Sequence, residues 1–285
     1  MRTSFSTLAC PDWEISQVVD IARRCGYEGI ELRFLQGEDS LWKLGDFQGV
    51  GLGTTKQRIR DAGLTVACVD TSCRFDSPDP KERQTWIEEG ERMAALASEL
   101  DAPGIRVFGD RVQEGVSRGT TENWIIECLS QLAQRIAGTK VQIWLETHGD
   151  FARAADVRAI VHQCEKVHVI WDPASAFVEN GEQPLESVKG IEGSITHVHI
   201  KDLRFDGEGR WTPVLMGHGE FPLPDLKRSL LRMKYEGFVS FEWEKKWHPE
   251  IQPAEIAVPH FANWFREKWE TLDLPSESHI TGAKS

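Results

Sequence analysis

Four short apolar runs of this chain each end on a residue type that binds metal ions. The four end residues are Glu146, Asp172, His199 and Glu242. Burying a carboxylate or an imidazole without a partner costs several kcal/mol, so an apolar strand that ends on one normally holds a partner or a cation there. Three carboxylates and one imidazole that met at one point would suit a hard or borderline divalent ion. The residue types therefore predict one bound metal ion, with Mn²⁺, Mg²⁺, Co²⁺ and Zn²⁺ as candidates.

Each of these residues also has an ordinary structural explanation when it is taken singly. Glu146 opens the polar segment 146–150, which is typical of an acidic helix-capping loop. Asp172 precedes Pro173, and an Asp-Pro pair commonly forms a turn. A single histidine inside a barrel, such as His199, is more often a hydrogen-bonded core residue than a ligand. The metal prediction therefore depends on all four residues ending four separate strand-like runs.

Further polar residues beside the four candidate ligands are suited to proton transfer and substrate binding. His197 alternates with His199, and Glu244 alternates with Glu242, so the members of each pair share a strand face. Glu244 has the alternative of simply pairing with a lysine. We expect substrate contacts from Arg106, His148, His197, Lys201 and Arg204.

Arg33 and the loop tryptophans are open to two interpretations. Arg33 either contacts the substrate or pairs with Glu31 outside the site. Tryptophans in predicted loops, including Trp211 and Trp247, either stack on a sugar face or pack as ordinary core and surface residues. Neither choice follows from the local sequence.

Strand-like and helix-like segments alternate along the chain, and this alternation must position the candidate site. We expect strands at 3–7, 29–33, 65–70, 104–108, 141–146, 167–172, 195–200 and 238–242. We expect helices at 14–25, 54–62, 80–100, 121–137, 154–164, 184–191, 224–235 and 253–270. Eight such pairs predict the α/β class and a closed TIM (β/α)8 barrel, whose chemistry lies at the carboxyl ends of the strands. An open doubly wound sheet would usually have a glycine-rich turn after its first strand, and residues 6–11 (STLACP) do not provide one.

The domain organisation and the covering segments follow from the same pattern. No linker divides the chain, so residues 1–274 are expected to form one barrel domain, and residues 275–285 are expected to form a loose tail. Two long connections, 203–216 and 245–253, are expected to cover the site and to hold its specificity.

Composition excludes several classes of protein. The 285 residues carry a formal net charge of −12, which disfavours nucleic acid as a partner. No run approaches the apolar length that a membrane span needs, so no membrane partner is expected. Six cysteines without a Cys-x-x-Cys pair indicate free thiols and a cytoplasmic protein. A small carbohydrate is the expected partner, and a homo-oligomer stays open.

Three motifs resemble those of a known family, the xylose isomerase-like TIM barrel superfamily, also called AP-endonuclease family 2. Segment 26–33 (GYEGIELR) looks like its second-strand signature. Segment 197–202 (HVHIKD), followed by Arg204, looks like its seventh-strand signature, and segment 217–221 (GHGEF) is similar to its turn before the seventh helix. The resemblance spans almost the whole chain, includes sugar phosphate isomerases and epimerases, and implies that the metal ligands fall on the four residues named first.

The chain departs from two branches of that family. The DNA-repair members use additional histidines on the third and fourth strands, where this chain has 70–72 (DTS) and 107–109 (VFG). They also have a histidine three residues after the sixth-strand aspartate, where this chain has Ser175. These departures argue against a trinuclear, DNA-cleaving cluster. Ser175 also replaces a substrate-contacting histidine of the ketose 3-epimerases.

The resemblance and the residues together predict a divalent-metal-dependent isomerase or epimerase of a small sugar or polyol, with or without a phosphate. The reaction would pass through an enediolate, with Glu146 and Glu242 as catalytic base and acid at opposite faces of the substrate. One alternative is a metal-dependent lyase or dehydratase of a keto-sugar or keto-inositol, with His148, His197 or Lys201 as the acid. Another is a sugar-binding barrel without catalysis, against which the intact ligand set argues.

Overall fold

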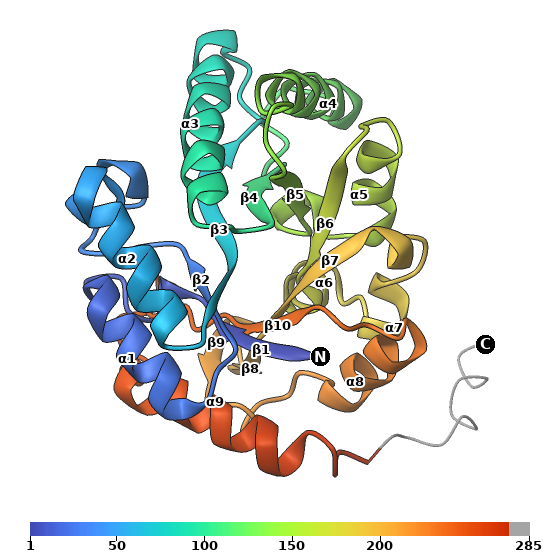
Figure 1. Cartoon of the computed structure of the whole chain (residues 1–285). Helices are drawn as coiled ribbons and strands as arrows, with labels where there is room; N and C mark the ends of the chain where they lie inside the picture. The colour runs from blue at the N-terminus through green and yellow to red at the C-terminus, as the bar shows by residue number, and fades with distance from the viewer. Residues whose placement is uncertain (274–285) are drawn as a thin grey trace, which may run out of the picture.

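Eight parallel strands form a TIM barrel in the computed structural model, which describes residues 1–273 (Figure 1). They are β1 (Arg2–Phe5), β2 (Gly29–Leu32), β3 (Thr65–Arg74), β4 (Gly104–Phe108), β5 (Gln142–Glu146), β6 (Val167–Trp171), β7 (Ile195–Ile200) and β10 (Phe238–Phe241). Their order is β1-β10-β7-β6-β5-β4-β3-β2. A parallel bridge between Ser6 and Glu31 joins the two ends of this order, so the ring is nearly closed. The predicted fold class is confirmed, and the predicted tail, 275–285, lies outside the described residues.

Helices surround the barrel on its outer side (Figure 1). They are α1 (Ile15–Cys25), α2 (Gly49–Asp61), α3 (Pro80–Glu99), α4 (Arg118–Arg135), α5 (Ala154–Val161), α6 (Pro173–Asn180), α7 (Pro184–Ser187), α8 (Leu223–Arg232) and α9 (Ala254–Lys268). Short 3-10 turns occupy Thr7–Ala9, Leu41–Lys43, Gly45–Phe47, Gly149–Phe151 and Glu192–Ser194. No helix within residues 1–273 is both long enough and apolar enough to cross a membrane.

Local signals at both helix ends explain the bounds of helix α1. Helix α1 starts with a capping box between Glu14 and Gln17 and stops at Gly26, whose φ is +78°. Helix α2 begins five residues before its predicted start, although its first turns are rich in glycine. Gly51 is required there, because a Cβ on it would lie 2.0 Å from the carbonyl oxygen of Gly45.

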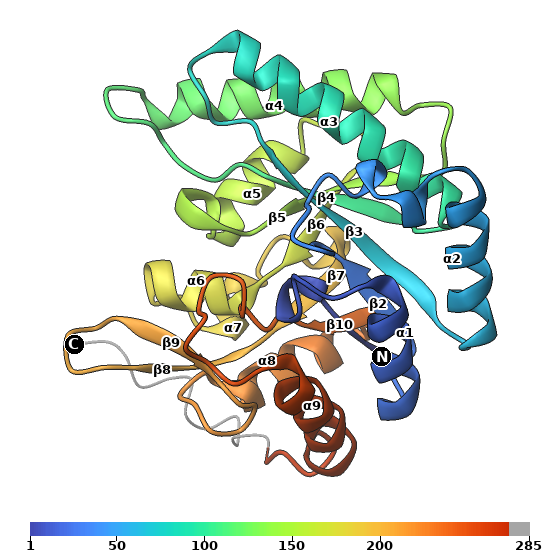
Figure 2. The same ribbon diagram turned by 90° about the vertical axis from the view of Figure 1, so that its left-hand side faces the viewer.

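Two elements were not predicted, and both follow strands that carry the candidate site. The Asp172-Pro173 pair forms no isolated turn; it caps and starts helix α6. The connection predicted as a loop over 203–216 contains an antiparallel hairpin, β8 (Asp202–Phe205) and β9 (Trp211–Val214). The hairpin projects beyond the barrel wall (Figure 2).

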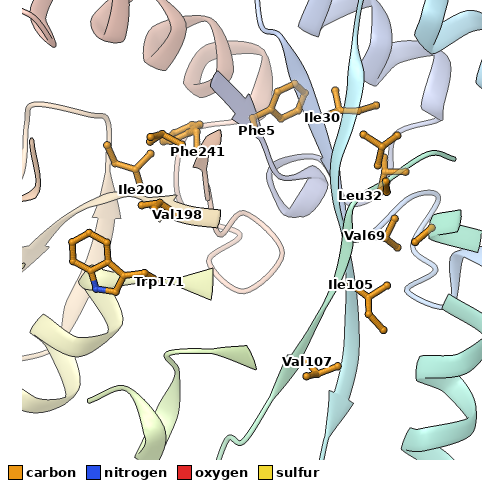
Figure 3. Packing of buried hydrophobic residues seen from close by; sticks show 14 of the residues in the cluster. Phe5, Ile30, Leu32, Val69, Ile105, Val107, Trp171, Val198, Ile200 and Phe241 are labelled. Atoms are coloured by element: carbon orange, nitrogen blue, oxygen red, sulfur yellow. The ribbon is translucent and has the colours of Figure 1, made fainter. Parts of the chain in front are cut away.

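The outward-facing residues of the strands form the apolar layer beneath the helices. Figure 3 shows members of this layer, among them Val69, Ile105, Trp171 and Val198, all of which are fully buried. Trp171 packs toward the helices, as alternation predicts, and its Nε1 donates a hydrogen bond to Ser187 Oγ at 3.1 Å. Fixing this layer fixes which alternate residues point into the barrel.

The inward-facing residues divide into a small apolar layer and a polar layer. Cys68, Trp144 and Ile170 form a buried apolar cluster of their own. Gly104 makes room for it, because a Cβ there would lie 2.3 Å from Trp144 Cε2. On β5, Glu146 shares the face of Trp144 and lies two residues nearer the carboxyl end of the strand. The apolar layer therefore supports the residues that could do chemistry.

Candidate metal centre

The four predicted ligands meet at the carboxyl end of the barrel. Glu146 ends β5, Asp172 and Glu242 directly follow β6 and β10, and His199 lies in β7. One donor atom from each lies within 4.8 Å of the other three, and all four side chains are buried. His199 Nδ1 is 2.9 Å from Glu146 Oε1 and 3.4 Å from Glu242 Oε1. The structure thus brings together the residues that the sequence selected, and their role as ligands stays a prediction.

Two buried cations compensate part of the negative charge of this cluster. Arg106 Nη1 lies 3.0 Å from Glu146 Oε2 and 3.8 Å from Glu242 Oε1. Lys201 Nζ lies 2.8 Å from Asp172 Oδ2, 2.5 Å from Glu242 Oε2 and 2.7 Å from Glu244 Oε1. The predicted pair of Glu244 with a lysine is therefore present, but inside the site.

Three of the carboxylates in contact with these cations, Glu146, Asp172 and Glu242, stay ionised despite their burial, whereas burial raises the pKa of Glu244. Burial raises the pKa of Glu146, but Arg106 and His199 outweigh it and hold that pKa below its ordinary value. Burial likewise opposes ionisation of Asp172 and Glu242, and Lys201 lowers the pKa of both. Burial lowers the pKa of Lys201 less than its three carboxylate partners raise it, so the lysine stays protonated.

A divalent cation fits this charge distribution. Glu31, Glu146, Asp172 and Glu242 all have lowered pKa values, while Arg106 and Lys201 supply two positive charges among them. The surplus of negative charge draws a proton onto His199: burial lowers its pKa, but Glu242, Glu31 and Glu146 raise it well above its ordinary value. A divalent ion would replace that proton and balance the remaining charge. The donor set, three carboxylates and one imidazole, suits such an ion.

Glu31 lies behind His199 and was not predicted as part of the site. Its Oε2 is hydrogen-bonded to His197 Nε2, and its Oε1 is 3.2 Å from His199 Nε2. Carboxylates behind a ligating histidine orient its ring in many metal proteins. The sequence feature that could have identified it is an acidic residue inside the short strand Gly29–Leu32, which the structure buries completely. Glu31, His197 and His199 also have donor atoms close enough to hold an ion, but Glu31 is already paired with both rings.

Asp172 has a structural role beside its place in the cluster. Its Oδ1 accepts hydrogen bonds from the backbone N–H groups of Ala174 and Ser175, at 2.9 and 3.1 Å. Ser175 Oγ donates to Asp172 Oδ2 at 2.7 Å. The carboxylate therefore caps helix α6, in place of the isolated turn that the Asp-Pro pair suggested. The cap holds the carboxylate in one orientation toward the site.

A cavity of about 310 Å³ opens beside the cluster. Glu146 and Glu242 line it, and so do three of the predicted substrate contacts, which are Arg106, His148 and Lys201. Arg33, Ser72, Arg74, Ser175, Trp211 and Trp247 line it as well. Both connections that were expected to cover the site therefore contribute a tryptophan to its wall.

The structure does not bring the other two predicted substrate contacts to this cavity. Arg204 is exposed on the hairpin and donates a hydrogen bond to the backbone oxygen of His218. His197 is buried behind His199, paired with Glu31, and its ring stacks on Trp144 with centroids 5.6 Å apart. His197 therefore supports the site from below.

His148 is held at the edge of the cavity by a carboxylate. Its Nδ1 lies 3.0 Å from Asp110 Oδ1. Burial lowers the pKa of His148, but the hydrogen bond to Asp110 and the charge of Glu146 raise it above its ordinary value overall. The ring is thus a potential proton donor within the cavity.

Comparisons with known proteins give one family match. A family model described as xylose isomerase-like TIM barrel matches residues 19–268. A search of the curated proteins found no match.

Several solved structures share the fold at low sequence identity. The IolI protein with a bound zinc atom has 17% identity, covers 93% of this chain and 97% of its own, and has a TM-score of 0.77. L-ribulose 3-epimerase has 18% identity, 95% coverage of both chains and a TM-score of 0.76. The probable 3-DHS dehydratase AsbF of Bacillus anthracis has 17% identity, covers 94% of this chain and 100% of its own, and has a TM-score of 0.74. At these identities the likeness shows the fold.

Proposed function

Because this chain belongs to the xylose isomerase-like TIM barrel family, we propose that it is a divalent-metal-dependent isomerase or epimerase of a small sugar or polyol. One observation supports this most strongly. Two buried carboxylates, Glu146 and Glu242, line a sugar-sized cavity and also belong to a cluster with the donor set of a divalent ion. Among proteins of the same fold, one is a ribulose epimerase and another has bound zinc.

The metal would be held by Glu146, Asp172, His199 and Glu242. When bound, it would polarise the substrate carbonyl and acidify the neighbouring C–H group. It would be one ion of Mn²⁺, Mg²⁺, Co²⁺ or Zn²⁺, since all four suit carboxylate and imidazole donors.

Proton transfer is assigned to the two glutamates. The lowered pKa values of Glu146 and Glu242 keep both ionised and able to accept a proton from carbon. One oxygen of Glu146 lies near His199 and the other near Arg106. One oxygen of Glu242 lies near His199 and the other near Lys201. The carboxylates are therefore fixed in place. One of them removes the proton from the carbon beside the carbonyl; the substrate regains a proton from that same carboxylate, or from the other one after it has taken up a proton from solvent.

A second candidate, a lyase or dehydratase of a keto-sugar, is favoured by the cationic groups in the cavity. Lys201 Nζ and His148 both line it; Lys201 is protonated, the raised pKa of His148 favours its protonated form, and either could donate to a leaving oxygen. A probable dehydratase has the same fold. Loss of water or of an alcohol after the same α-proton is removed would produce this outcome.

The first experiment is the metal content of the purified protein, measured for the wild type beside Glu146→Ala and His199→Ala. We expect near-stoichiometric divalent metal in the wild type and its loss in both variants. Glu28→Gln, an exposed position on the same chain, is the control and should retain the metal. No bound metal, together with no thermal stabilisation by added Mn²⁺, would overturn the proposal.

The second experiment separates the two reactions. Metal-loaded protein is incubated in D₂O with aldo- and keto-sugars, and the products are followed by NMR. A product that carries deuterium at the α-carbon and otherwise keeps the composition of the substrate supports an isomerase or epimerase. Net loss of water identifies the dehydratase. Glu242→Gln should abolish exchange at one face of the substrate, and unchanged turnover in this variant would refute its role.

A further inference from the structure

Arg33 is a buried cation with unusually little compensation. It follows β2, only 5% of its surface is exposed, and it lines the cavity beside the metal cluster. Its Nη2 donates a hydrogen bond to Ser72 Oγ at 2.7 Å. Its Nη1 is buried and has no hydrogen-bond partner among the described residues. A buried guanidinium without a close acceptor is costly, and such a group normally has a partner.

The nearest carboxylate compensates Arg33 poorly. Asp39 Oδ2 lies 3.8 Å from Arg33 Nη1, and the Asp39 side chain is 37% exposed to solvent. That same oxygen accepts a hydrogen bond from Ser72 Oγ. Glu31, the alternative partner suggested by the sequence, pairs with His197 and His199. Arg33 therefore lines the cavity without a close carboxylate partner.

The other buried cations that line the cavity are closely paired. Arg106 lies 3.0 Å from Glu146, and Lys201 has three carboxylate contacts between 2.5 and 2.8 Å. Arg74, at the exposed side of the cavity, lies 3.5 Å from Asp110. Burial and the charge of Arg106 lower the pKa of Arg33 to about 10, against the opposing charges of Asp70, Asp39 and Glu146, so Arg33 still carries its charge at neutral pH. Of the three buried cations that line the cavity, Arg33 is therefore the one that lacks a close carboxylate.

The backbone around Arg33 holds this donor in a fixed place. Thr7 Oγ1 accepts hydrogen bonds from the N–H groups of Arg33 and Phe34, at 2.7 and 3.1 Å. The guanidinium lies over the Phe34 ring, with its Cζ 4.2 Å from the centroid. Trp247 contacts the same ring edge-on and also lines the cavity. A planar guanidinium stacked in this way presents its free N–H groups in a preset direction.

We infer that the substrate carries an anionic group, a carboxylate or a phosphate, and that Arg33 binds it while the carbonyl end lies at the metal cluster. This inference rests on the proposed function, because it assigns the substrate class of the same cavity: sugar acids or sugar phosphates rather than neutral sugars. A guanidinium forms charge-assisted hydrogen bonds to either group.

The test is a binding comparison with three probes that share one carbon skeleton. The probes are D-fructose, D-fructuronate and D-fructose 6-phosphate, titrated calorimetrically into Mn²⁺-loaded protein. We expect at least one anionic probe to bind more tightly than D-fructose. Arg33→Met should weaken the binding of that probe about 10- to 100-fold and should leave D-fructose unchanged. Preference for D-fructuronate or for the phosphate ester identifies which anion the site takes.

Two further variants separate recognition from structure. Arg33→Lys keeps the charge without the planar fork, and it should restore part of the anion preference. Arg24→Met, at an exposed arginine on α1, should behave as wild type. If Arg33 were only structural, Arg33→Met would lower the unfolding temperature and leave the order of the three affinities unchanged, which would refute the inference.

The inference and the proposed function fail in different ways. If neutral and anionic probes exchange their α-protons equally well, and Arg33→Met does not change this, the inference is refuted and the enzyme assignment stands. If no probe undergoes exchange but an anionic probe binds and Arg33→Met abolishes that binding, the anion site stands and the proposed function is refuted.

Discussion

Glu31→Gln tests whether the residue behind His199 orients it toward a metal. The change replaces a carboxylate with an amide of the same shape in a side chain that is 0% exposed. In the structure one oxygen is bonded to His197 Nε2 and the other lies 3.2 Å from His199 Nε2. An amide has only one oxygen, so it cannot accept hydrogen bonds from both rings as the two carboxylate oxygens can. At least one histidine therefore loses its partner.

The expected magnitude follows from those contacts. Removal of a partner behind a metal ligand typically costs about 10- to 100-fold in metal affinity. This corresponds to about 1.4 to 2.8 kcal/mol, since each tenfold change is about 1.4 kcal/mol. Because Glu31 contacts the ligating histidine and its neighbour in the barrel, we expect a loss within this range and not below it.

The assay is calorimetric titration of metal-free protein with Mn²⁺, repeated with Co²⁺ so that the absorption spectrum reports the coordination. Glu28→Gln makes the same substitution at an exposed position just before β2 and should leave the Kd unchanged. Urea unfolding of both variants checks that the barrel is intact. A Glu31→Gln protein that is folded and binds Mn²⁺ as tightly as the wild type, with the same Co²⁺ spectrum, would refute the reasoning.

Three other predictions concern the site and its support. Mn²⁺ affinity should rise as the pH is raised above the ordinary titration range of histidine, because His199, whose pKa lies well above its ordinary value in the metal-free protein, must lose its proton to bind. An affinity independent of pH would contradict this. Lys201→Met should tighten Mn²⁺ binding and lower turnover, because it removes a positive charge from two of the ligands; weaker Mn²⁺ binding would show that the lysine supports the site. Gly104→Ala should lower the free energy of unfolding in urea by about 1 to 3 kcal/mol, because the added Cβ would lie 2.3 Å from the Trp144 ring. Gly53→Ala is the control and should not destabilise the protein, because a Cβ there would have no atom within 4 Å.

The sequence alone predicted the barrel and the four-residue cluster because both depend on local pattern. Alternation within one strand decides which side chains point inward, and parallel strands of a barrel bring their carboxyl ends to one face. Glu146 and Asp172 could therefore be placed on the same face before any contact between them was known. The bounds of β4 and β7 agree with the predicted ones for the same reason, since alternation marks both strands.

Local pattern could not predict helix α6 or the β8–β9 hairpin. Asp172 reads equally well as a turn or as a helix cap, and only the hydrogen bonds from Ala174 and Ser175 decide between them. The hairpin is held by Asp202, whose carboxylate accepts hydrogen bonds from the backbone of Gly217 and Gly219. The Asp202 contacts join residues 15 and 17 positions apart, beyond the reach of a local pattern.

Which inward residues meet one another was decided only by the tertiary structure. Glu31 lies on β2 and reaches His197 and His199 on β7, strands that are not neighbours in the barrel wall. The same contact leaves Arg33 without Glu31 as a partner, so its guanidinium faces the cavity. A strand pattern specifies the direction of a side chain, but its partner across the barrel depends on how the ring closes, and that closure brings together residues whose separation in sequence carries no signal.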